Sequence, residues 1–235
     1  EFRRVLFRSG YSAPASMPPD MMRPVGGAAR VTEGSRLQSS AVGRANSGLR
    51  WPAMVEADRA AVLAAVSGLS PLTAGQITLP GGAERPTSFR QAVDRGVAFV
   101  SGDRRKLGLM LDKPIWENIV QVRSVGLARD GAFLTKARLR QRAADLARRV
   151  GVKTQTVDAP AGSLSGGNQQ KVVLAKWLDI TPEVMLLDDP TRGVDVGARE
   201  EINQLLRKSA AAGAVVLYLS TDLEELVAGC DRVLV

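Results

Sequence analysis

The chain has 235 residues, of which 45% are hydrophobic and 24% charged, a balance typical of a globular protein and not of a collagen-like or wholly disordered chain. It contains no histidine, which excludes histidine general bases, histidine-activated nucleophiles and histidine-ligated zinc. The single cysteine, Cys230, excludes an internal disulfide, and no run reaches the roughly 18 apolar residues that a membrane span needs.

The net charge of +8 is concentrated at the start of the chain, where residues 1–50 hold eight arginines and three acids. This stretch has no initiator Met, is dense in Gly, Pro, Ser and Arg, and lacks a sustained hydrophobic period. We therefore expect residues 1–49 to be a disordered or non-native leader, and order to begin near Arg50.

Local patterns then predict the first ordered elements. Residues 54–69, MVEADRAAVLAAVSGL, have helical periodicity, and turn residues surround a brief strand at Gln76–Leu79. A helix over 88–96 ends at a glycine, and Val97–Val100 is a short apolar run suited to a strand covered on both faces.

Residues 101–160 change character and indicate a mostly helical insert. A polar loop, 102–109, precedes a helical segment at 114–127. Residues 135–152, TKARLRQRAADLARRVGV, form a strongly basic amphipathic pattern that ends at Gly151.

From residue 163 helices and strands alternate to the end of the chain. The expected elements are helix Asn168–Leu178, strand Val184–Leu187, helix Ala198–Ala211, strand Val215–Leu219, helix Asp222–Val227 and a strand from Val233. This alternation predicts a parallel α/β sheet. The last strand runs into Val235, so we expect the domain to be truncated at its C-terminus.

Two segments carry the chemistry. In LSGGNQQK, residues 164–171, Ser165 can cap a helix whose first N–H groups are left uncovered by Gly166 and Gly167, as in a phosphate-binding helix terminus. The alternative is a turn that caps a buried helix.

The second segment, VMLLDDPTRGVD at 184–195, is an apolar strand that ends in Asp188 and Asp189. Carboxylates at the C-terminal edge of a parallel sheet lie where ligands bind in open α/β folds. One can hold magnesium through water and its neighbour can orient an attacking water, although strand ends are also acidic because they meet solvent.

Together LSGGNQQKVVLAKWL and LLDDPTRGVDVGAREEI resemble the ATP-binding subunit of bacterial ABC importers for ribose, galactose or xylose, and specifically its second nucleotide-binding domain. GVAFVSGDRRKLGLMLDKPIWENI and LYLSTDLEELVAGCDRVLV are similar to flanking parts of that domain. The resemblance covers about residues 53–235. It implies an ABC-type P-loop NTPase-like α/β fold, with the nucleotide-binding domain over 50–235 and a helical subdomain over about 104–165.

The resemblance also implies roles for individual residues. Ser165, Gly166, Gly167 and Gln169 belong to a signature loop (164–169), which contacts the γ-phosphate of a nucleotide held by another domain. Asp188 is the magnesium residue of the Walker B strand, and Asp189 takes the position of the catalytic glutamate. The D-loop (193–196) contains Asp195 and crosses the dimer interface.

The segment that should bind the nucleotide departs from the family pattern. A P-loop needs GxxxxGK[ST], and no such string occurs in the sequence. At the corresponding place, PAMVEADRAAVL has Glu56 and Asp58 where glycines are expected, and no lysine. Because two negative side chains repel a triphosphate, we expect the isolated chain to bind ATP weakly or not at all.

Three further positions depart from the pattern. Ser101 and Gly102 replace a Pro-Glu pair, and Asp189 is about 1.5 Å shorter in reach than glutamate. Thr221 lies at the switch position, where active domains have histidine and second domains of this type commonly do not. These departures predict no hydrolysis at this domain's own site.

The resemblance therefore implies half of a sugar importer's ATPase. The chain would donate its signature loop to ATP and Mg²⁺ bound by a P-loop-bearing partner domain, at the inner face of the cell membrane. Its further partners would be a transmembrane permease and, indirectly, a periplasmic sugar-binding protein, whereas nucleic acid is not expected.

Two alternatives remain open at this stage. The chain could be a soluble ABC-type regulatory or nucleic-acid-associated module, for which the basic pattern around Arg138–Arg149 is the main support. It could also be a non-functional fragment, because both ends and the Walker A region depart from the family.

Overall fold

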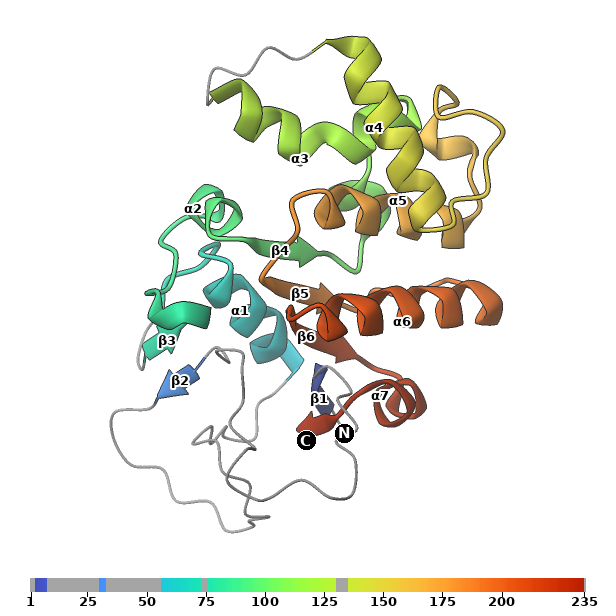
Figure 1. The fold of residues 1–235 in the computed structure, drawn as a ribbon. Helices are drawn as coiled ribbons and strands as arrows, with labels where there is room; N and C mark the ends of the chain where they lie inside the picture. The colour runs from blue at the N-terminus through green and yellow to red at the C-terminus, as the bar shows by residue number, and fades with distance from the viewer. Residues whose placement is uncertain (1–2, 8–29, 33–55, 73–75, 130–134, 235) are drawn as a thin grey trace, which may run out of the picture.

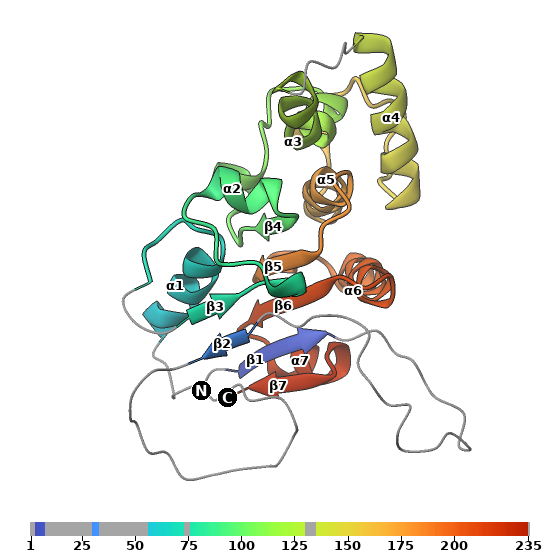
Figure 2. The same cartoon turned by 60° about the vertical axis from the view of Figure 1, so that its left-hand side comes forward.

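The computed structural model describes residues 3–7, 30–32, 56–72, 76–129 and 135–234. Within them the chain forms an α/β structure in which helices cover both faces of a central sheet (Figures 1 and 2). The α/β class predicted from the alternation of helices and strands is confirmed.

The central sheet has five strands in the order β4-β5-β6-β1-β7. Strands β4 (Val97–Val100), β5 (Val184–Asp188) and β6 (Val215–Ser220) are parallel neighbours. Strand β1 (Arg3–Phe7) lies between β6 and β7 (Arg232–Leu234) and pairs antiparallel with both. Strands β4, β5 and β6, which the sequence predicted, are therefore parallel. The antiparallel pairs of this sheet are those that β1, near the start of the chain, makes with β6 and β7.

A separate two-stranded ribbon pairs β2 (Arg30–Thr32) antiparallel with β3 (Gln76–Thr78). Both β1 and β2 lie within the leader, residues 1–49, that was expected to be disordered. These two short strands pair with neighbouring strands and so are not disordered, while the alternative expectation of a non-native leader stays a prediction; the other residues of that segment lie outside the described residues.

The helices follow the order expected from the sequence. They are α1 (Glu56–Val66), α2 (Phe89–Asp94), α3 (Ile115–Arg129), α4 (Lys136–Arg149), α5 (Gly166–Leu178), α6 (Val196–Ala211) and α7 (Leu223–Gly229). Three short turns complete the described elements: η2 (Pro80–Gly82), the π-helical turn η3 (Arg104–Gly108) and η4 (Ala161–Ser163). The polar loop expected at 102–109 therefore contains a helical turn.

Helices α5 and α6 begin two residues before their predicted starts because each has a polar cap. The Ser165 side chain accepts a hydrogen bond from the backbone N–H of Asn168, and Asp195 accepts one from Ala198. A capping oxygen satisfies an N–H of the first turn, which otherwise lacks an intrahelical partner. The helices therefore extend through Gly166 and Val196, the residues that follow the caps.

Alternate residues of β5 pack into two cores, one on each face of the sheet. Met185 and Leu187 belong to the larger core, which helices α3 to α7 also line, whereas Val184 and Leu186 pack with α1, β3 and α2. All four are fully buried. This is the two-sided burial predicted for continuous apolar strands in a parallel sheet.

Helices α3 and α4 form a layer outside α5, on the side away from the sheet (Figure 1). Asp179, directly after α5, is buried and pairs with Arg142 of α4, while Arg123 of α3 donates to its carbonyl oxygen. Burial raises the pKa of Asp179, opposed by the bond and charge of Arg142. The helical insert expected at 101–160 is confirmed, and no helix of the described part is long and apolar enough to cross a membrane.

Candidate functional site

The signature loop (164–169) lies at the N-terminus of α5. The Ser165 side chain accepts hydrogen bonds from the backbone N–H of Asn168, at 3.5 Å, and from the Asn168 side-chain amide, at 3.0 Å. Gly166 is partly exposed, whereas Gly167 is buried. A helix N-terminus with short side chains leaves N–H groups and the positive end of the helix dipole accessible to an anion.

The D-loop packs directly against these two glycines. A Cβ atom on Gly167 would lie 2.4 Å from Cβ of Ala198 and 3.4 Å from a carboxylate oxygen of Asp195. A Cβ atom on Gly166 would lie 3.1 Å from the carbonyl oxygen of Gly193. Packing therefore requires glycine at both positions. The structure brings the signature loop and the D-loop together on one surface.

Gln169 lies beneath the loop. Its side chain is 2% exposed and its amide nitrogen donates to the carbonyl oxygen of Leu164 at 3.0 Å. The side-chain oxygen is buried without a hydrogen-bond partner among the described residues. In this arrangement Gln169 supports the backbone of the loop from inside the domain.

The two predicted carboxylates lie at the carboxyl end of β5 in different environments. Asp188, partly exposed, is the last residue of the strand. Asp189 follows it with a φ of 42°, in the left-handed region that non-glycine residues seldom adopt. Its backbone N–H donates to Leu219 at 2.9 Å, and its carboxylate accepts from the backbone N–H of Thr221 at 3.0 Å. The Asp189 carboxylate thus caps the end of β6.

The ends of three parallel strands meet at this edge. A Cβ atom on Gly102, after β4, would lie 3.0 Å from the carbonyl oxygen of Asp188 and 3.5 Å from Cβ of Asp189. Thr221 follows β6 and is exposed. The structure therefore brings Gly102, Asp188, Asp189 and Thr221 together, as the parallel sheet predicts.

A buried carboxylate, Glu225, links the segment after β5 to the end of β6. Its Oε2 atom accepts hydrogen bonds from the hydroxyls of Thr191, at 2.9 Å, and Ser220, at 3.0 Å. Tyr218 lies 3.4 Å from the Thr191 hydroxyl, and burial and the Glu225 charge raise the pKa of the tyrosine. These hydrogen bonds fix the segment between β5 and the D-loop relative to the end of β6, just before Thr221.

The acidic edge does not fit a magnesium nucleotide held by this chain alone. The sequence has no GxxxxGK[ST], the string whose backbone N–H groups and lysine hold the phosphates of a magnesium nucleotide. The backbone of Glu56 and Asp58 lies in α1, while their side chains are outside the described residues. We therefore assign no chemical step to a nucleotide at this edge.

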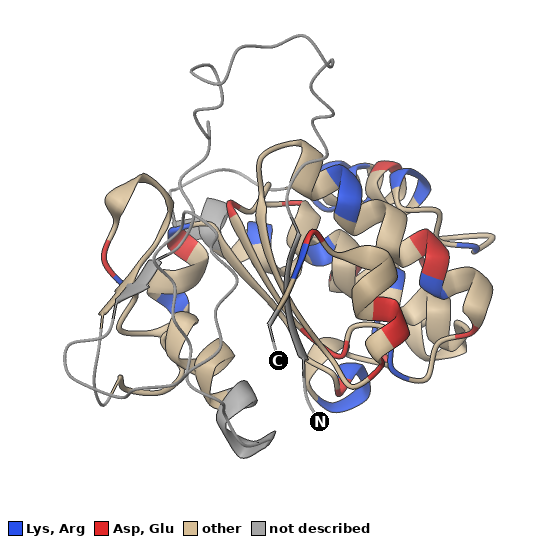
Figure 3. Ribbon diagram, turned by 90° about the horizontal axis from the view of Figure 1, so that it is seen from below, with Lys and Arg blue, Asp and Glu red and all other residues tan. Residues whose placement is uncertain are grey.

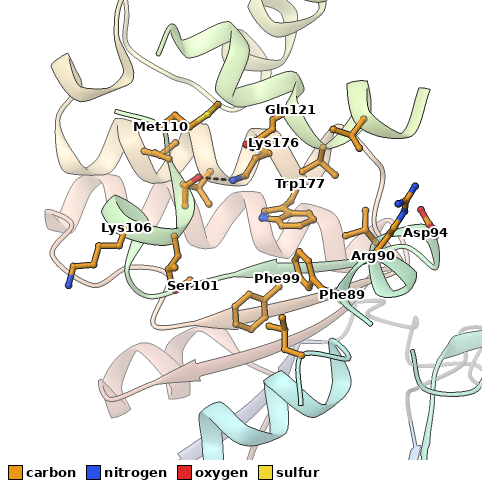
Figure 4. Close-up of a pocket in the computed structure, with 18 residues that line it drawn as sticks. Phe89, Arg90, Asp94, Phe99, Ser101, Lys106, Met110, Gln121, Lys176 and Trp177 are labelled. Atoms are coloured by element: carbon orange, nitrogen blue, oxygen red, sulfur yellow. Dashed lines mark hydrogen bonds between the residues drawn. The ribbon is translucent and has the colours of Figure 1, made fainter. Parts of the chain in front are cut away.

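A cavity of about 670 Å³ lies between α2, β4, η3, α3 and α5 (Figure 4). Its lining is largely apolar and aromatic, with Phe89 packed edge-on against Trp177 at a centroid distance of 6.1 Å. Two rim side chains, Leu107 and Val125, are 74% and 64% exposed. An apolar hollow with exposed apolar side chains at its rim is suited to receive a partner.

Lys176 lies in the wall of this cavity and was not singled out from the sequence. Its amine is buried, donates to the carbonyl oxygen of Gly108 at 2.6 Å and lies 5.8 Å from the centre of the Trp177 ring. Burial lowers the pKa of Lys176 to about 8. In sequence it is one of two lysines on a helix, and nothing there marks it as buried.

The second lysine of α5, Lys171, is also buried. Its amine donates to the carbonyl oxygen of Gly151, at 2.9 Å, and pairs with Glu201 of α6. The hydrogen bond and charge of Lys171 lower the pKa of Glu201. The helix that carries the signature loop is therefore tied to the end of α4 and to α6.

Comparison with known proteins bears on these features. A family model described as "ABC transporter" matches residues 60–192. Among curated proteins, the ribose import ATP-binding protein RbsA 3 of Rhizobium meliloti is 43% identical over 181 residues, which are 77% of this chain and 36% of that protein. RbsA of Geobacillus kaustophilus is 37% identical over 192 residues, 82% of this chain and 39% of that protein.

Solved structures support the fold. The ATP-binding cassette MJ0796, in a dimeric post-hydrolysis state bound to ADP and Pi, superposes with a TM-score of 0.61 at 20% identity, covering 74% of this chain and 79% of that chain. A second dimeric structure of this cassette gives 0.60. At this identity the likeness establishes an ABC ATPase fold.

The chain spans about a third of the length of the curated relatives it matches. The family model nevertheless covers more than half of the chain, and the fold agrees with it. The chain therefore belongs to the ABC transporter family.

Proposed function

We propose that this chain is the second ATP-binding domain of a sugar ABC importer, and that it donates its signature loop to a nucleotide held by a P-loop-bearing partner domain. The observation that carries the proposal is the joint surface of Gly166, Gly167 and the D-loop, where Gly193 and Asp195 approach the glycines. The names of the relatives, ribose import ATP-binding proteins, support the importer class.

In this proposal the chain's own residues bind and orient. The first turn of α5 and Ser165 stabilise the negative charge of the partner's γ-phosphate, and Asp195 lies beside them at the start of α6. ATP with Mg²⁺, when bound by the partner, supplies the phosphoryl group. Gln169 supports the loop from beneath.

The chain's own acidic edge is proposed to be inactive. Asp189, at the position of the catalytic base, has its carboxylate hydrogen-bonded to the backbone N–H of Thr221. The P-loop string is absent from the sequence. Asp188 remains the proposed magnesium residue only if a nucleotide reaches this edge, and the isolated chain is proposed not to hydrolyse ATP.

The partners follow from two surfaces. The P-loop-bearing domain is proposed to contact the signature loop and the D-loop, and the permease to contact the apolar cavity whose rim includes Leu107 and Val125. We therefore propose that the chain lies on the inner face of the cell membrane, with a periplasmic sugar-binding protein as an indirect partner. The proposed domain covers 50–235, with the helical subdomain over about 104–165.

The basic helix α4 gives little support to a nucleic-acid-associated module. Three of its arginines, Arg140, Arg142 and Arg148, pair with Asp158, Asp179 and Asp145. Figure 3, which shows the molecule from below, has blue and red segments interspersed among the helices. A surface that binds nucleic acid by charge needs unpaired cations gathered on one face.

The test is the steady-state ATPase activity of the chain mixed with a P-loop-bearing ATP-binding domain of a sugar importer, compared with that domain alone. We expect stimulation, and we expect Ser165→Arg or Gly166→Asp to abolish it, because the first crowds and the second repels the γ-phosphate. Asp189→Asn is the matched control and should retain most of the activity.

Two results would contradict the proposal. One is a loss of turnover in Asp189→Asn while the signature variants stay active, which would reverse the two roles. The other is the absence of stimulation by a correctly folded chain, as expected for a non-functional fragment. Calorimetric titration of the isolated chain with ATP-Mg should show no micromolar binding, because the phosphate cradle is missing.

A further inference from the structure

Arg104 reaches from the segment after β4 to Arg192 and to Gly193, the first residue of the D-loop, which are 88 and 89 residues further along the chain. It is the first residue of η3, and its guanidinium donates to the carbonyl oxygens of Arg192, at 2.7 Å, and Gly193, at 3.3 Å. Two backbone carbonyls on neighbouring residues match the fork of an arginine, which donates in two directions from one rigid plane.

The same guanidinium touches the signature loop. A Cβ atom built on Gly166 would lie 2.7 Å from Nη2 of Arg104 and 3.1 Å from the carbonyl oxygen of Gly193. The arginine therefore lies between the two loops that form the proposed contact surface. Gly166 leaves room for it, which is a second reason for a glycine at this position.

The turn η3, which begins with Arg104, is fixed on α5, the helix that starts at the signature loop. Gly108, at the other end of η3, packs against Val173 of α5, where an added Cβ atom would lie 3.1 Å from the valine side chain. The amine of Lys176 donates to the carbonyl oxygen of Gly108, as the dashed line in Figure 4 shows. The turn η3 is thus fastened to α5 at one end and extends Arg104 to the D-loop at the other.

Placing the guanidinium here has an electrostatic cost. Burial and the neighbouring charge of Arg105 lower the pKa of Arg104, while Asp103 opposes this shift. Hydrogen bonds from a charged donor to carbonyl groups are stronger than neutral ones and offset such a cost. A solvated surface arginine would incur no such cost and would make no such contacts.

We propose that Arg104 is a positioning residue that holds the signature loop and the D-loop in fixed relation, so that both reach the partner domain's nucleotide together. The inference rests on the proposed function, because it assigns Arg104 a role in presenting that surface. Arg104 itself acts through the carbonyl groups of the D-loop and through its contact with Gly166.

The experiment uses the reconstituted pair described above and compares Arg104→Ala, Arg104→Lys and Arg105→Ala. Arg105 is exposed and carries the same charge one residue away, so it is the matched control. We expect Arg104→Ala to lower kcat about tenfold with the ATP KM within about twofold, because ATP binding depends on the partner's P-loop. Lysine, which replaces the fork with a point charge, should recover about a third of wild-type kcat.

A double-mutant cycle with Gly166→Ala tests the contact itself. The added methyl group collides with the guanidinium, so removing Arg104 should relieve part of the effect, and the combined loss of kcat should be smaller than the product of the single losses. The proposal would be overturned if the double variant lost kcat by the product of the two single losses. It would also be overturned if Arg104→Ala and Arg105→Ala gave equal ATPase activity with the partner domain.

Amide exchange in the chain alone separates this proposal from the proposed function. Arg104→Ala should accelerate exchange at Val194, whose N–H donates to Thr191 at 3.1 Å, and at Gln169 of the signature loop, while Arg105→Ala should not. If the wild-type chain mixed with the P-loop-bearing domain lacks ATPase activity, the proposed function fails. The exchange rates still test whether Arg104 links the signature loop to the D-loop. Unchanged exchange at both sites in Arg104→Ala would refute this link.

Discussion

The signature loop and the acidic edge of the sheet are both rich in polar groups, but those groups are used differently. At the signature loop, Gly166 and Gly167 allow the D-loop to approach, and Ser165 caps the first turn of α5. At the acidic edge, Asp189 and Glu225 accept hydrogen bonds from within the domain.

The presence of a motif and the availability of its polar groups are therefore separate properties. Both regions contain residues that the sequence marked as functional, but the signature loop is a capped helix N-terminus, whereas the Asp189 carboxylate at the acidic edge caps the end of β6. One oxygen of the Asp189 carboxylate accepts from the backbone N–H of Thr221, and this bond fixes the orientation of the side chain.

The largest effect is expected from Gly167→Ala, because the new methyl group would lie 2.4 Å from Cβ of Ala198, which has no rotamer to change. Overpacking of this kind costs about 1–3 kcal/mol of unfolding free energy and displaces the loop. Urea unfolding and the ATPase assay of the pair should both show the loss.

Ala198→Gly provides the matched rescue. Removing the opposing methyl group in the double variant should restore ATPase activity and most of the stability, because the clash is gone. Failure of this rescue would mean that Gly167 is needed for a reason other than its contact with α6.

Next in size is the pH dependence of stability caused by Lys176. Its pKa is lowered from 10.5 to about 8 by burial, so between these values the unfolded chain binds a proton that the folded chain does not. Stability from this group therefore rises with pH from about 8 to 10.5, by about 2 kcal/mol between pH 7.5 and 9.5. The measurement is the free energy of unfolding of wild type minus that of Lys176→Met at each pH.

Removing the charge is the control for this effect. Lys176→Met keeps the apolar stem and cannot titrate, so the difference should grow with pH in favour of the wild type. A difference that is constant with pH would show that Lys176 keeps an ordinary pKa in the fold.

A smaller effect is expected from Thr191→Val in the Glu225 cluster. The substitution removes the hydroxyl that donates to a buried carboxylate at 2.9 Å, at a cost of about 1 kcal/mol, because Ser220 still donates to the same oxygen. Thr191→Ser keeps the donor and should lose less. Equal losses in urea unfolding would indicate that packing, and not the hydrogen bond, matters at Thr191.

The smallest effect is expected from Asp189→Asn. Asparagine keeps an oxygen that can accept from the N–H of Thr221, and it tolerates the φ of 42° better than most residues. The free energy of unfolding should change by less than about 0.5 kcal/mol. Asp189→Ala loses the acceptor and is strained at positive φ, so it should lose about 1 kcal/mol, and a neutral result there would argue against the capping role.

Much of the fold could be predicted because its signals are local. Val97–Val100 was predicted with its observed bounds, and Val184–Leu187 differs from β5 only by Asp188, since apolar runs mark strands buried on both faces. The pairing of β1 could not be predicted, because the hydrogen bonds of this strand go to β6 and β7, which are far along the chain.

The candidate site divides in the same way. Ser165, the glycines after it and Asp195 were identified from their motifs, because capping and glycine spacing are local properties. Arg104 was missed because a basic residue in the run Arg104–Lys106 has the same sequence signal whether it is solvated or bound. Gln169 was expected in the contact loop, but helix geometry directs its side chain inward.

The sequence by itself determined the succession of helices and strands, the capped glycine terminus of α5, the acidic end of β5 and the absence of a P-loop string, because each depends on neighbouring residues. Only the tertiary structure decided that Asp189 caps Thr221, that Lys176 is buried against Gly108, and that Arg104 joins the signature loop to the D-loop. These contacts join residues 32 to 89 positions apart, and their geometry is set by how α5 and the sheet pack.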